Sequence, residues 1–365
     1  MIHAVELTST LDPVINGGIS SSLPDLAAAL QLQNVDSRVK EFGQGWKRAL
    51  HRLVDLASLI QQNDLVHIHG LWEPHCALGS RVAWETNRPY MVSAHGYLER
   101  WAFREKSWKK KPYTWLVERQ TLNRAACLRA LTRTEIDDYR RIGVSAPIAL
   151  IPNGVSIPED TSSNEFLEKF PELRDKSLVL FLGRIHHKKG LDILCHAWAD
   201  RSRRDHHLVI AGPKDSPAFR QIKSLVGSLG IERSVTFTGM LQGGMKWSAL
   251  AASDLFVLAS RGEGFSMAAL EAAGMGVPLL LSDCCNFPEV ADLQCGWVVR
   301  PEIGAVAEAL GEACDTSSSK REEMSHRCQK MIQDRYTWKA IARQMSEVYQ
   351  GLLAGTGPIG AGIFN

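Results

Sequence analysis

The segment Ser260-Arg-Gly-Glu263-Gly-Phe-Ser-Met-Ala-Ala-Leu-Glu271-Ala-Ala-Gly-Met-Gly-Val-Pro278 lies between two short apolar runs, 255–258 and 278–281. Glycines on either side of Glu263 permit a tight turn at the end of the first run. Residues 266–273 favour a helix. A strand, a glycine turn and a helix in this order are typical of a parallel α/β sheet. The free amides at the start of such a helix predict a binding site for an anion.

The same alternation of apolar runs and helical patterns extends along the chain in both directions. Each run is short, and most are followed by a turn residue and an amphipathic stretch, which indicates parallel sheets covered on both faces. The runs are 2–7, 65–69, 90–93, 128–131, 149–151, 178–182, 207–211, 235–238, 255–258, 278–281 and 296–299. These are too many strands for one Rossmann-like sheet, so we expect two doubly wound domains.

Turn residues mark where the chain divides. Pro152-Asn153-Gly154 ends a run, and a polar stretch over 158–164 follows it before the strand pattern resumes. We therefore expect a first domain over 1–155 and a second over 156–335. A helical periodicity then follows in a segment over 336–365, whose glycine-rich end from residue 354 we expect to be frayed.

Composition excludes several classes of protein. Of the 365 residues 45% are hydrophobic and 22% charged, and the net charge is +2, which is the balance of a globular chain and not of a polyanion binder. No uncharged apolar run is long enough to span a bilayer, and the first residues suggest a buried strand and not a signal peptide. The eight cysteines form no C-x-x-C pair, so we expect free thiols in a cytoplasmic protein.

A second motif follows the run 178–182 and reads Gly183-Arg-Ile-His-His-Lys-Lys189-Gly190. Arg184 offers a planar fork and Lys189 a mobile point charge, a combination suited to a diphosphate. This motif and the Glu263 segment both follow parallel strands, whose carboxyl ends are where open α/β sheets bind ligands. Carboxylates there would repel a phosphate but would accept hydrogen bonds from sugar and ribose hydroxyls. Either motif alone could be a solvated surface loop; together they indicate a sugar-nucleotide site.

The spacing of Glu263 and Glu271, with seven residues between them, resembles the E-x7-E signature of the retaining GT-B glycosyltransferases of family 4, glycosyltransferase group 1. Four other elements resemble the same family over about residues 1–350: Gly183-Arg184 with Lys189-Gly190, Pro152-Asn-Gly-Val155, Asn16-Gly17-Gly18 and His67-Ile-His69-Gly70-Leu-Trp72. The resemblance implies an α/β protein of two Rossmann-like doubly wound domains that face a central cleft. It implies an acceptor site in the first domain, a nucleotide sugar in the second, and a last helix that crosses back.

The resemblance also assigns roles to residues. The catalytic residues it implies are His95, Arg184, Lys189 and Glu263. The donor-binding residues are Gly17, Gly18, Arg184, Lys189, Met240, Glu263, Gly264, Phe265, Ser266, Met267 and Glu271. In this assignment His95 lies near the anomeric centre, although a loop histidine with satisfied hydrogen bonds is the alternative. Glu271 binds the nucleotide ribose.

The activity implied is transfer, with retention, of a sugar from a UDP- or GDP-sugar to a glycan or lipid-linked acceptor. The pathway would be exopolysaccharide, lipopolysaccharide or other glycoconjugate biosynthesis. The sequence holds no D-x-D metal motif, so we expect Arg184 and Lys189 to stabilise the leaving group without a metal or other cofactor. A GT-B sugar-nucleotide epimerase and a non-catalytic sugar-nucleotide-binding protein stay open as alternatives. A dehydrogenase is disfavoured, since the G-x-G-x-x-G at 355–360 has no helix to follow.

The stretch Arg100–Arg129 is strongly basic, with nine basic and two acidic residues, a local charge of +7. Trp101, Trp108 and Trp115 recur in it at intervals of seven residues. A basic face with aromatic anchors fits a peripheral contact with an anionic membrane, at the inner face of which the enzyme could act. The alternative is a stripe of core tryptophans opposite solvated lysines. A nucleic-acid partner is not expected, because the rest of the chain supplies a sugar-nucleotide site.

Overall fold

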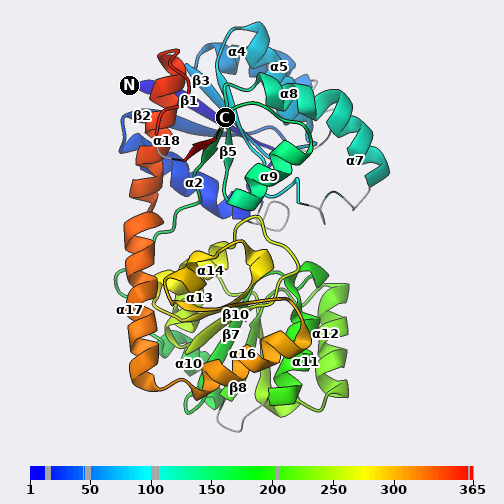
Figure 1. The fold of residues 1–365 in the computed structure, drawn as a ribbon, viewed down its shortest axis with the longest axis vertical. Helices are drawn as coiled ribbons and strands as arrows, with labels where there is room; N and C mark the ends of the chain where they lie inside the picture. The colour runs from blue at the N-terminus through cyan, green and yellow to red at the C-terminus, as the bar shows by residue number, and fades with distance from the viewer. Residues whose placement is uncertain are drawn as a thin grey trace. The chain divides into compact units, whose positions relative to one another are not determined.

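The computed structural model describes residues 1–365 except 13–17, 44, 46–50, 100–102, 104–106, 202–205, 361 and 365. The chain forms two compact units (Figure 1). Unit 1 consists of Met1–Gly154 and Tyr336–Asn365, and unit 2 of Val155–Arg335. The last segment of the chain therefore belongs to the unit built by the first segment.

Unit 1 contains a seven-stranded sheet in the order β13-β6-β5-β4-β3-β1-β2. Its strands are β1 (Ile2–Thr8), β2 (Val35–Glu41), β3 (Leu65–His69), β4 (Tyr90–Ser93), β5 (Cys127–Ala130), β6 (Ile148–Leu150) and β13 (Ile363–Phe364). Neighbouring strands are parallel, except that β13 pairs antiparallel with β6. The strand order reverses between β1 and β3, so the switch point of this sheet lies there.

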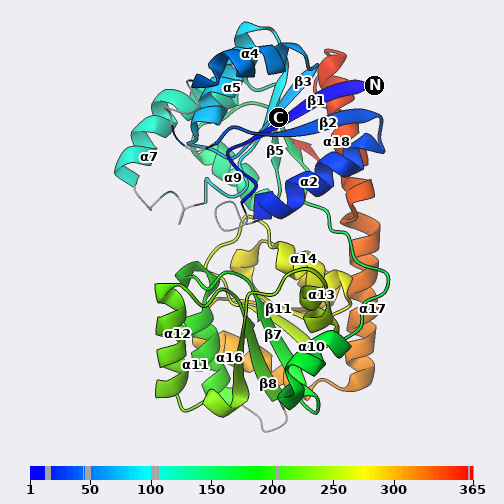
Figure 2. The same ribbon diagram turned by 180° about the vertical axis from the view of Figure 1, so that it is seen from behind.

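Helices cover both faces of this sheet (Figures 1 and 2). The helices are α2 (Gly18–Gln31), α4 (Leu53–Gln61), α5 (Pro74–Glu85), α7 (Ser107–Tyr113), a π-helical turn (Thr114–Glu118), α8 (Arg119–Arg124), α9 (Arg133–Arg141) and α18 (Trp338–Leu353). One apolar cluster packs α2 and α18 against the sheet, and a second packs α4, α5, α8 and α9 against the opposite face. Covering on both faces explains why the central strands β3, β4 and β5 are buried along their whole length.

Unit 2 contains a six-stranded, wholly parallel sheet in the order β12-β11-β10-β7-β8-β9. Its strands are β7 (Ser177–Leu182), β8 (His206–Ala211), β9 (Val235–Gly239), β10 (Leu255–Leu258), β11 (Leu279–Ser282) and β12 (Gly296–Val299). The order reverses between β7 and β10. The two motifs singled out in the sequence follow these two strands.

Two helical layers enclose this second sheet, as Figure 2 shows: α11, α12 and α16 on one side, and α10, α13, α14 and α17 on the other. The α-helices are α10 (Asn164–Lys169), α11 (Leu191–Arg201), α12 (Pro217–Ser228), α13 (Gly243–Ala251), α14 (Met267–Gly274), α15 (Glu289–Asp292), α16 (Ile303–Asp315) and α17 (Ser318–Arg335). Short 3-10 turns lie at Pro171–Leu173, His187–Lys189, Glu232–Ser234 and Asp283–Cys285.

The expected pair of doubly wound α/β sheets is confirmed, and each predicted strand lies within one residue of an observed one. Two strands were not predicted. β2 reads Val-Asp-Ser-Arg-Val-Lys-Glu, an edge strand without an apolar run. The prediction of a frayed end was wrong for Ile363–Phe364, because the backbone of these residues pairs with β6 as β13.

The eight cysteines are free thiols, six of them buried. Among the described residues, no helix has both the length and the apolar composition needed to cross a bilayer.

Gly154, the last residue of unit 1 before the chain enters unit 2, lies against Trp338, the first residue of α18. A Cβ on Gly154 would lie 2.7 Å from the Trp338 ring and 2.9 Å from its Cα. Only glycine therefore allows the end of β6 and the start of α18 to pack this closely.

We expect Gly154→Ala to lower the free energy of unfolding of unit 1 by about 1–3 kcal/mol, because the ring and the backbone of Trp338 must both shift. Gly304→Ala is the matched control, since a Cβ there meets nothing within 4 Å in α16. Denaturant unfolding followed by tryptophan fluorescence measures both variants. Equal stability of Gly154→Ala and the wild type would contradict the packing described.

Candidate functional site

The two motifs of unit 2 are joined through Arg261, which follows β10. Its backbone N–H donates to the carbonyl of Lys188 at 2.7 Å, and its Nη1 donates to the carbonyl of His187 at 2.9 Å. Its guanidinium also forms a bidentate pair with Asp192 of α11, at 2.8 and 2.5 Å. The loop after β7 and the loop after β10 are thus held together at the switch point of the sheet.

Gly190 permits the close approach of these loops. Its φ is 64°, in the left-handed region, and a Cβ there would lie 1.9 Å from the carbonyl oxygen of Ala259. The position therefore requires glycine both for its backbone conformation and for space.

Lys189 and Glu263 form an ion pair, with Nζ and Oε1 2.7 Å apart. The hydroxyl of Ser260 donates to the same Oε1 at 2.5 Å. Burial favours the neutral form of Glu263, but the charges of Lys189 and Lys188 and the hydrogen bonds from Lys189 and Ser260 outweigh it and lower the pKa of the carboxyl. Glu263 is therefore a buried, fully ionised carboxylate, and its Oε2 has no partner within the described part of the chain.

The backbone around Glu263 leads directly into α14. The Glu263 N–H donates to the carbonyl of Cys284 at 2.9 Å, and Asn286 Nδ2 donates to the carbonyl of Glu263 at 2.6 Å. Ser266 caps the helix by accepting from the N–H of Ala269 at 3.3 Å. The N–H groups of Met267 and Ala268 make no hydrogen bond among the described residues, so they point out of the helix as donors for an anion.

Glu271, the second glutamate of the motif, lies in the interior of α14 and forms an ion pair with Lys246 of α13, with Oε1 and Nζ 2.6 Å apart. The Lys246 ammonium also lies over the ring of Trp247, 4.3 Å from its centroid. Lys246 was not predicted, because nothing in the sequence connects it to a residue 25 positions away.

Arg184 and Met240 lie apart from these ion pairs. Arg184 is exposed and makes no hydrogen bond or ion pair with the described residues. Met240 follows β9 and is half exposed, and its sulfur accepts from Gln242 at 3.7 Å. Phe265 packs against Phe287, with ring centroids 5.7 Å apart. The structure therefore brings Lys189 and Glu263 together, whereas the roles assigned to the other residues of this unit stay predictions.

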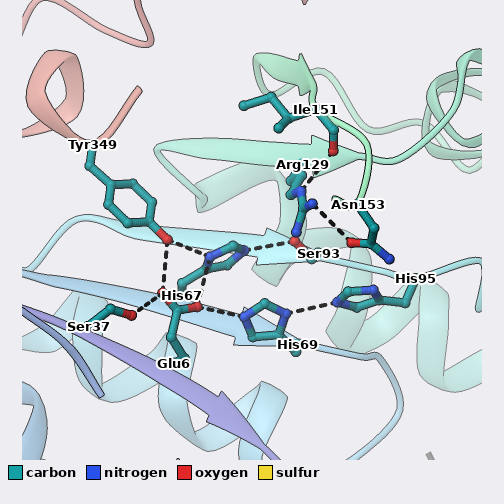
Figure 3. Close-up of polar contacts among 10 residues, drawn as sticks. All are labelled: Glu6, Ser37, His67, His69, Ser93, His95, Arg129, Ile151, Asn153 and Tyr349. Atoms are coloured by element: carbon teal, nitrogen blue, oxygen red, sulfur yellow. Dashed lines mark hydrogen bonds and ion pairs between the residues drawn. The ribbon is translucent and has the colours of Figure 1, made fainter. Parts of the chain in front are cut away.

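Unit 1 holds His95 in the turn after β4, where its Nε2 lies 2.8 Å from Nδ1 of His69 (Figure 3). His69 in turn contacts Glu6 of β1, with Nε2 and Oε2 2.7 Å apart. Gly18 is the first residue of α2, whereas Gly17 lies outside the described residues. His95 is thus the end of a polar chain that reaches the interior of the sheet.

The same carboxylate connects the last helix to the sheet. Tyr349 of α18 donates to Glu6 Oε1 at 3.1 Å, and Ser37 of β2 donates to it at 3.0 Å. Nδ1 of His67 lies 2.7 Å from the Tyr349 hydroxyl and 3.0 Å from Glu6 Oε2. Glu6, His67 and His69 also have donor atoms within 4.8 Å of one another, a combination that could hold a metal ion.

Arg129 is fully buried beside this network and holds the segment that leaves unit 1 (Figure 3). Its guanidinium donates to the carbonyl of Ile151 at 2.8 Å, to that of Pro152 at 2.6 Å and to Oδ1 of Asn153 at 3.0 Å. Burial lowers the pKa of Arg129 to about 10, so the group stays charged at neutral pH. The Pro-Asn-Gly motif is therefore fixed by a side chain of β5.

Two protein-family models match this chain. The model for glycosyl transferases group 1 matches residues 162–333, and the model for the glycosyl transferase 4-like domain matches residues 24–154. The chain belongs to the group 1 glycosyltransferases. The predicted family is thereby confirmed, and the two matches correspond to unit 2 and to the first segment of unit 1.

Relatives of this glycosyltransferase are about a quarter identical to it over the aligned residues. The α-D-kanosaminyltransferase of Streptomyces kanamyceticus is 29% identical over 64% of this chain and 62% of its own. An uncharacterized glycosyltransferase of Methanocaldococcus jannaschii is 27% identical over 48% of this chain and 45% of its own. The chain thus spans less than two thirds of the length of these two relatives. The GDP-mannose-dependent α-(1-6)-phosphatidylinositol monomannoside mannosyltransferase of Mycolicibacterium smegmatis is 24% identical, over 80% and 78% of the two chains.

Solved structures show that the fold of this glycosyltransferase is GT-B. The sucrose-phosphate synthase of Thermosynechococcus elongatus superposes with a TM-score of 0.79 and 19% identity, over 97% of this chain and 100% of that one. The Anabaena protein HepE, in complex with UDP-glucose, gives a TM-score of 0.78 and 17% identity, over 96% and 100%.

Several residues of the two networks were not predicted in the sequence of this glycosyltransferase. Of these residues, Glu6 was the one that the sequence indicated most clearly, since a carboxylate within a buried apolar strand needs a partner. His67 and His69 are spaced by two on a strand, which places them on one face of the sheet. Ser260, Arg261 and Asp192 gave no such signal, because their contacts depend on how the two loops fold.

We expect Glu263→Gln to change how stability depends on pH. The folded-state pKa of Glu263 lies below the ordinary value of 4.5, so its ionisation stabilises the fold above that pH, and this stabilisation is lost as the pH falls through the folded-state pKa. The wild type should therefore be more stable than the variant at neutral pH, and the difference should shrink below about pH 4. Denaturant unfolding across this range measures it. A difference that does not change with pH would contradict the ionised pair.

Proposed function

We propose that this protein is a retaining, metal-independent glycosyltransferase that moves a sugar from a UDP- or GDP-sugar to a glycan or lipid-linked acceptor. The observation that carries the proposal is the ion pair of Lys189 with the buried Glu263 at the switch point of the unit 2 sheet. Beside it in the sequence lie the exposed Arg184 and the unbonded amides that begin α14. Cations, amides and a carboxylate together suit a diphosphate joined to a polyol.

Glu263 and Lys189 bind different parts of the donor, the sugar and the diphosphate respectively. Both described contacts of the Glu263 carboxylate go to Oε1, so Oε2 is left to accept a hydrogen bond from a sugar hydroxyl. Lys189 has three N–H donors, and its contact with Glu263 uses one of them. The others can bind the diphosphate while the lysine keeps the carboxylate ionised.

The reaction breaks the bond between the anomeric carbon and a phosphate oxygen, and the electron pair stays on the nucleoside diphosphate. Arg184, Lys189 and the α14 amides stabilise that negative charge as it develops. The acceptor oxygen bonds to the anomeric carbon, and its proton passes to the departing phosphate on the same face of the sugar. Same-face attack gives retention without a covalent enzyme intermediate. The fixed cations perform the work that a D-x-D-bound metal would otherwise perform.

Relatives support the substrate classes. The name of the Mycolicibacterium smegmatis relative gives GDP-mannose as its donor and a mannosylated phosphatidylinositol as its acceptor. That of the Streptomyces relative gives transfer of a kanosaminyl group. We extend from these names only the use of a nucleotide sugar and of a glycan or lipid-linked acceptor, in glycoconjugate or polysaccharide biosynthesis.

We expect Lys189→Ala to lower turnover by about 100-fold or more, because it removes a cation from the leaving group. Its folding should change far less, as judged by circular dichroism and thermal unfolding. The assay incubates the protein with a panel of UDP- and GDP-sugars and candidate acceptors, with and without EDTA, and follows products by mass spectrometry.

Lys223→Ala, on the exposed surface of α12, is the matched control. Near-normal turnover in Lys189→Ala, or loss of activity in EDTA, would contradict the mechanism. Isomerised donor without a glycosylated product would show an epimerase instead.

We further propose that α7 and the π-helical turn after it contact an anionic membrane. Trp108 is 73% exposed, Trp115 57% and Leu116 72%, so these side chains are not part of the core. Cations accompany the rings: Lys109 lies 4.8 Å from the centroid of Trp108, and Arg119 lies 4.9 Å from that of Trp115. Exposed aromatic and basic groups on one segment suit the interface between lipid headgroups and acyl chains.

Two charged residues of the stretch, Arg129 and Glu118, are buried and take no part in its surface. Because their charges are opposite, their burial leaves the net charge of the stretch unchanged. Arg100 and Trp101 lie outside the described residues.

We expect Lys109→Gln/Lys111→Gln to weaken binding to phosphatidylglycerol vesicles by about 10- to 100-fold, at about 1 kcal/mol per lysine. Lys110 is left in place because its ammonium lies 4.2 Å from the ring centroid of Trp72 and supports the fold. Co-sedimentation with vesicles measures binding, and Lys320→Gln/Lys339→Gln on exposed positions is the control. Equal binding by the two double variants, or binding that high salt does not weaken, would contradict the proposal.

A further inference from the structure

A chain of three polar side chains crosses unit 1 from β1 to the turn after β4 (Figure 3). Glu6 Oε2 and His69 Nε2 are 2.7 Å apart, and His69 Nδ1 and His95 Nε2 are 2.8 Å apart. Glu6 and His69 are fully buried, whereas His95 is half-buried. Only the outer end of the chain can therefore reach a ligand.

The order of these contacts fixes where the protons lie. An ionised carboxylate can only accept, so His69 must donate its Nε2–H to Glu6. Burial lowers the pKa of His69 to about 3, so the ring is neutral and its Nδ1 is an acceptor. His95 must then donate its Nε2–H to that atom.

His95 is left with a lone pair on Nδ1. Burial lowers its pKa, and the charge of Arg129 lowers it further, so the ring is neutral at physiological pH. Its Nδ1 has no hydrogen-bond partner among the residues that the structure describes. A neutral imidazole whose Nε2 carries the hydrogen offers Nδ1 as an acceptor and not as an acid.

The backbone at His95 is held in an uncommon conformation. Its φ is 54°, in the left-handed region. The N–H groups on either side are anchored by buried side chains: that of Ala94 donates to the Tyr139 hydroxyl at 2.9 Å, and that of Gly96 donates to Glu135 at 2.7 Å. A non-glycine residue held with positive φ by its surroundings is typical of a functional site.

We propose that Glu6 and His69 are positioning residues that hold His95 in the Nε2–H tautomer, with its Nδ1 lone pair available to a hydroxyl of the bound substrate. The proposal rests on the proposed function only in taking that substrate to be a sugar. Tyr349 and Ser37 add hydrogen bonds to the other carboxylate oxygen and keep Glu6 in place.

A metal ion bound by Glu6, His67 and His69 is the competing explanation of this cluster. Ligands held about 2.0–2.2 Å from a tetrahedral zinc would lie about 3.3 Å or more from one another. Here Glu6 Oε2 lies 2.7 Å from His69 Nε2 and 3.0 Å from His67 Nδ1, which are hydrogen-bond distances. The geometry therefore favours protons over a metal between these atoms.

The decisive measurement is the tautomer of His95 in the wild-type protein, read from two-bond ¹⁵N–¹H couplings after histidine-selective labelling. His69→Asn and His95→Gln assign the two rings. We expect both histidines to be neutral Nε2–H tautomers throughout the neutral pH range. An Nδ1–H tautomer or a protonated ring at His95, or stoichiometric zinc in the purified protein, would overturn the proposal. This readout needs no substrate, so it stands or fails independently of glycosyl transfer.

Variants then test whether the tautomer matters for the reaction. His69→Leu removes the acceptor that faces His95, whereas His69→Asn can keep one near the place of Nδ1. We expect His69→Leu and Glu6→Gln to lose the single tautomer of His95 and to lower kcat on the order of 10-fold or more, with partial recovery in His69→Asn. Lys40→Ala, at an exposed position of β2 away from this chain, should retain both. Loss of kcat with an unchanged His95 tautomer would show a merely structural role and overturn the proposal.

Discussion

The ion pair between Lys189 and Glu263 is the constraint on which the unit 2 site depends. A buried lone carboxylate would become protonated. The Lys189 ammonium keeps the Glu263 carboxylate ionised, and in the proposed function both charges bind the donor, a diphosphate joined to a sugar. The pair exists because Arg261 binds the loop after β7 to the loop after β10, and because Gly190 allows Ala259 to approach it.

Unit 1 also has polar side chains beside the switch point of its sheet, but they form a different arrangement. Its polar chain lies where β1, β3 and β4 end, next to the switch point, and it carries hydrogen bonds where unit 2 carries an ion pair. Glu6 joins this chain to α18 through Tyr349, so the returning C-terminal helix supports the network as well as the core. In both sheets the apolar interior fixes the strands, and the polar side chains gather where the strands end.

The sequence was sufficient for the fold because buried parallel strands are continuous apolar runs, which periodicity detects. It did not suffice for β2, whose polar residues suit a sheet edge, or for β13, which depends on backbone pairing with β6. For the site, the motifs placed Lys189 and Glu263 on two loops of one sheet edge. The residues that hold Lys189 and Glu263 in place, Ser260 and Arg261 among them, could not be predicted. Their contacts depend on the conformation of the loops and not on sequence spacing.

The proposed function requires a nucleotide sugar to bind where β7 and β10 of unit 2 end. Hydrogen exchange with UDP and GDP, and with their sugars, tests it most directly, because it shows which amides the ligand protects. We predict slower exchange in residues 183–190 and 260–271 with at least one nucleotide, and much weaker protection of the same segments in Lys189→Ala. Protection confined to other parts of the chain, or equal protection in the variant, would contradict the account.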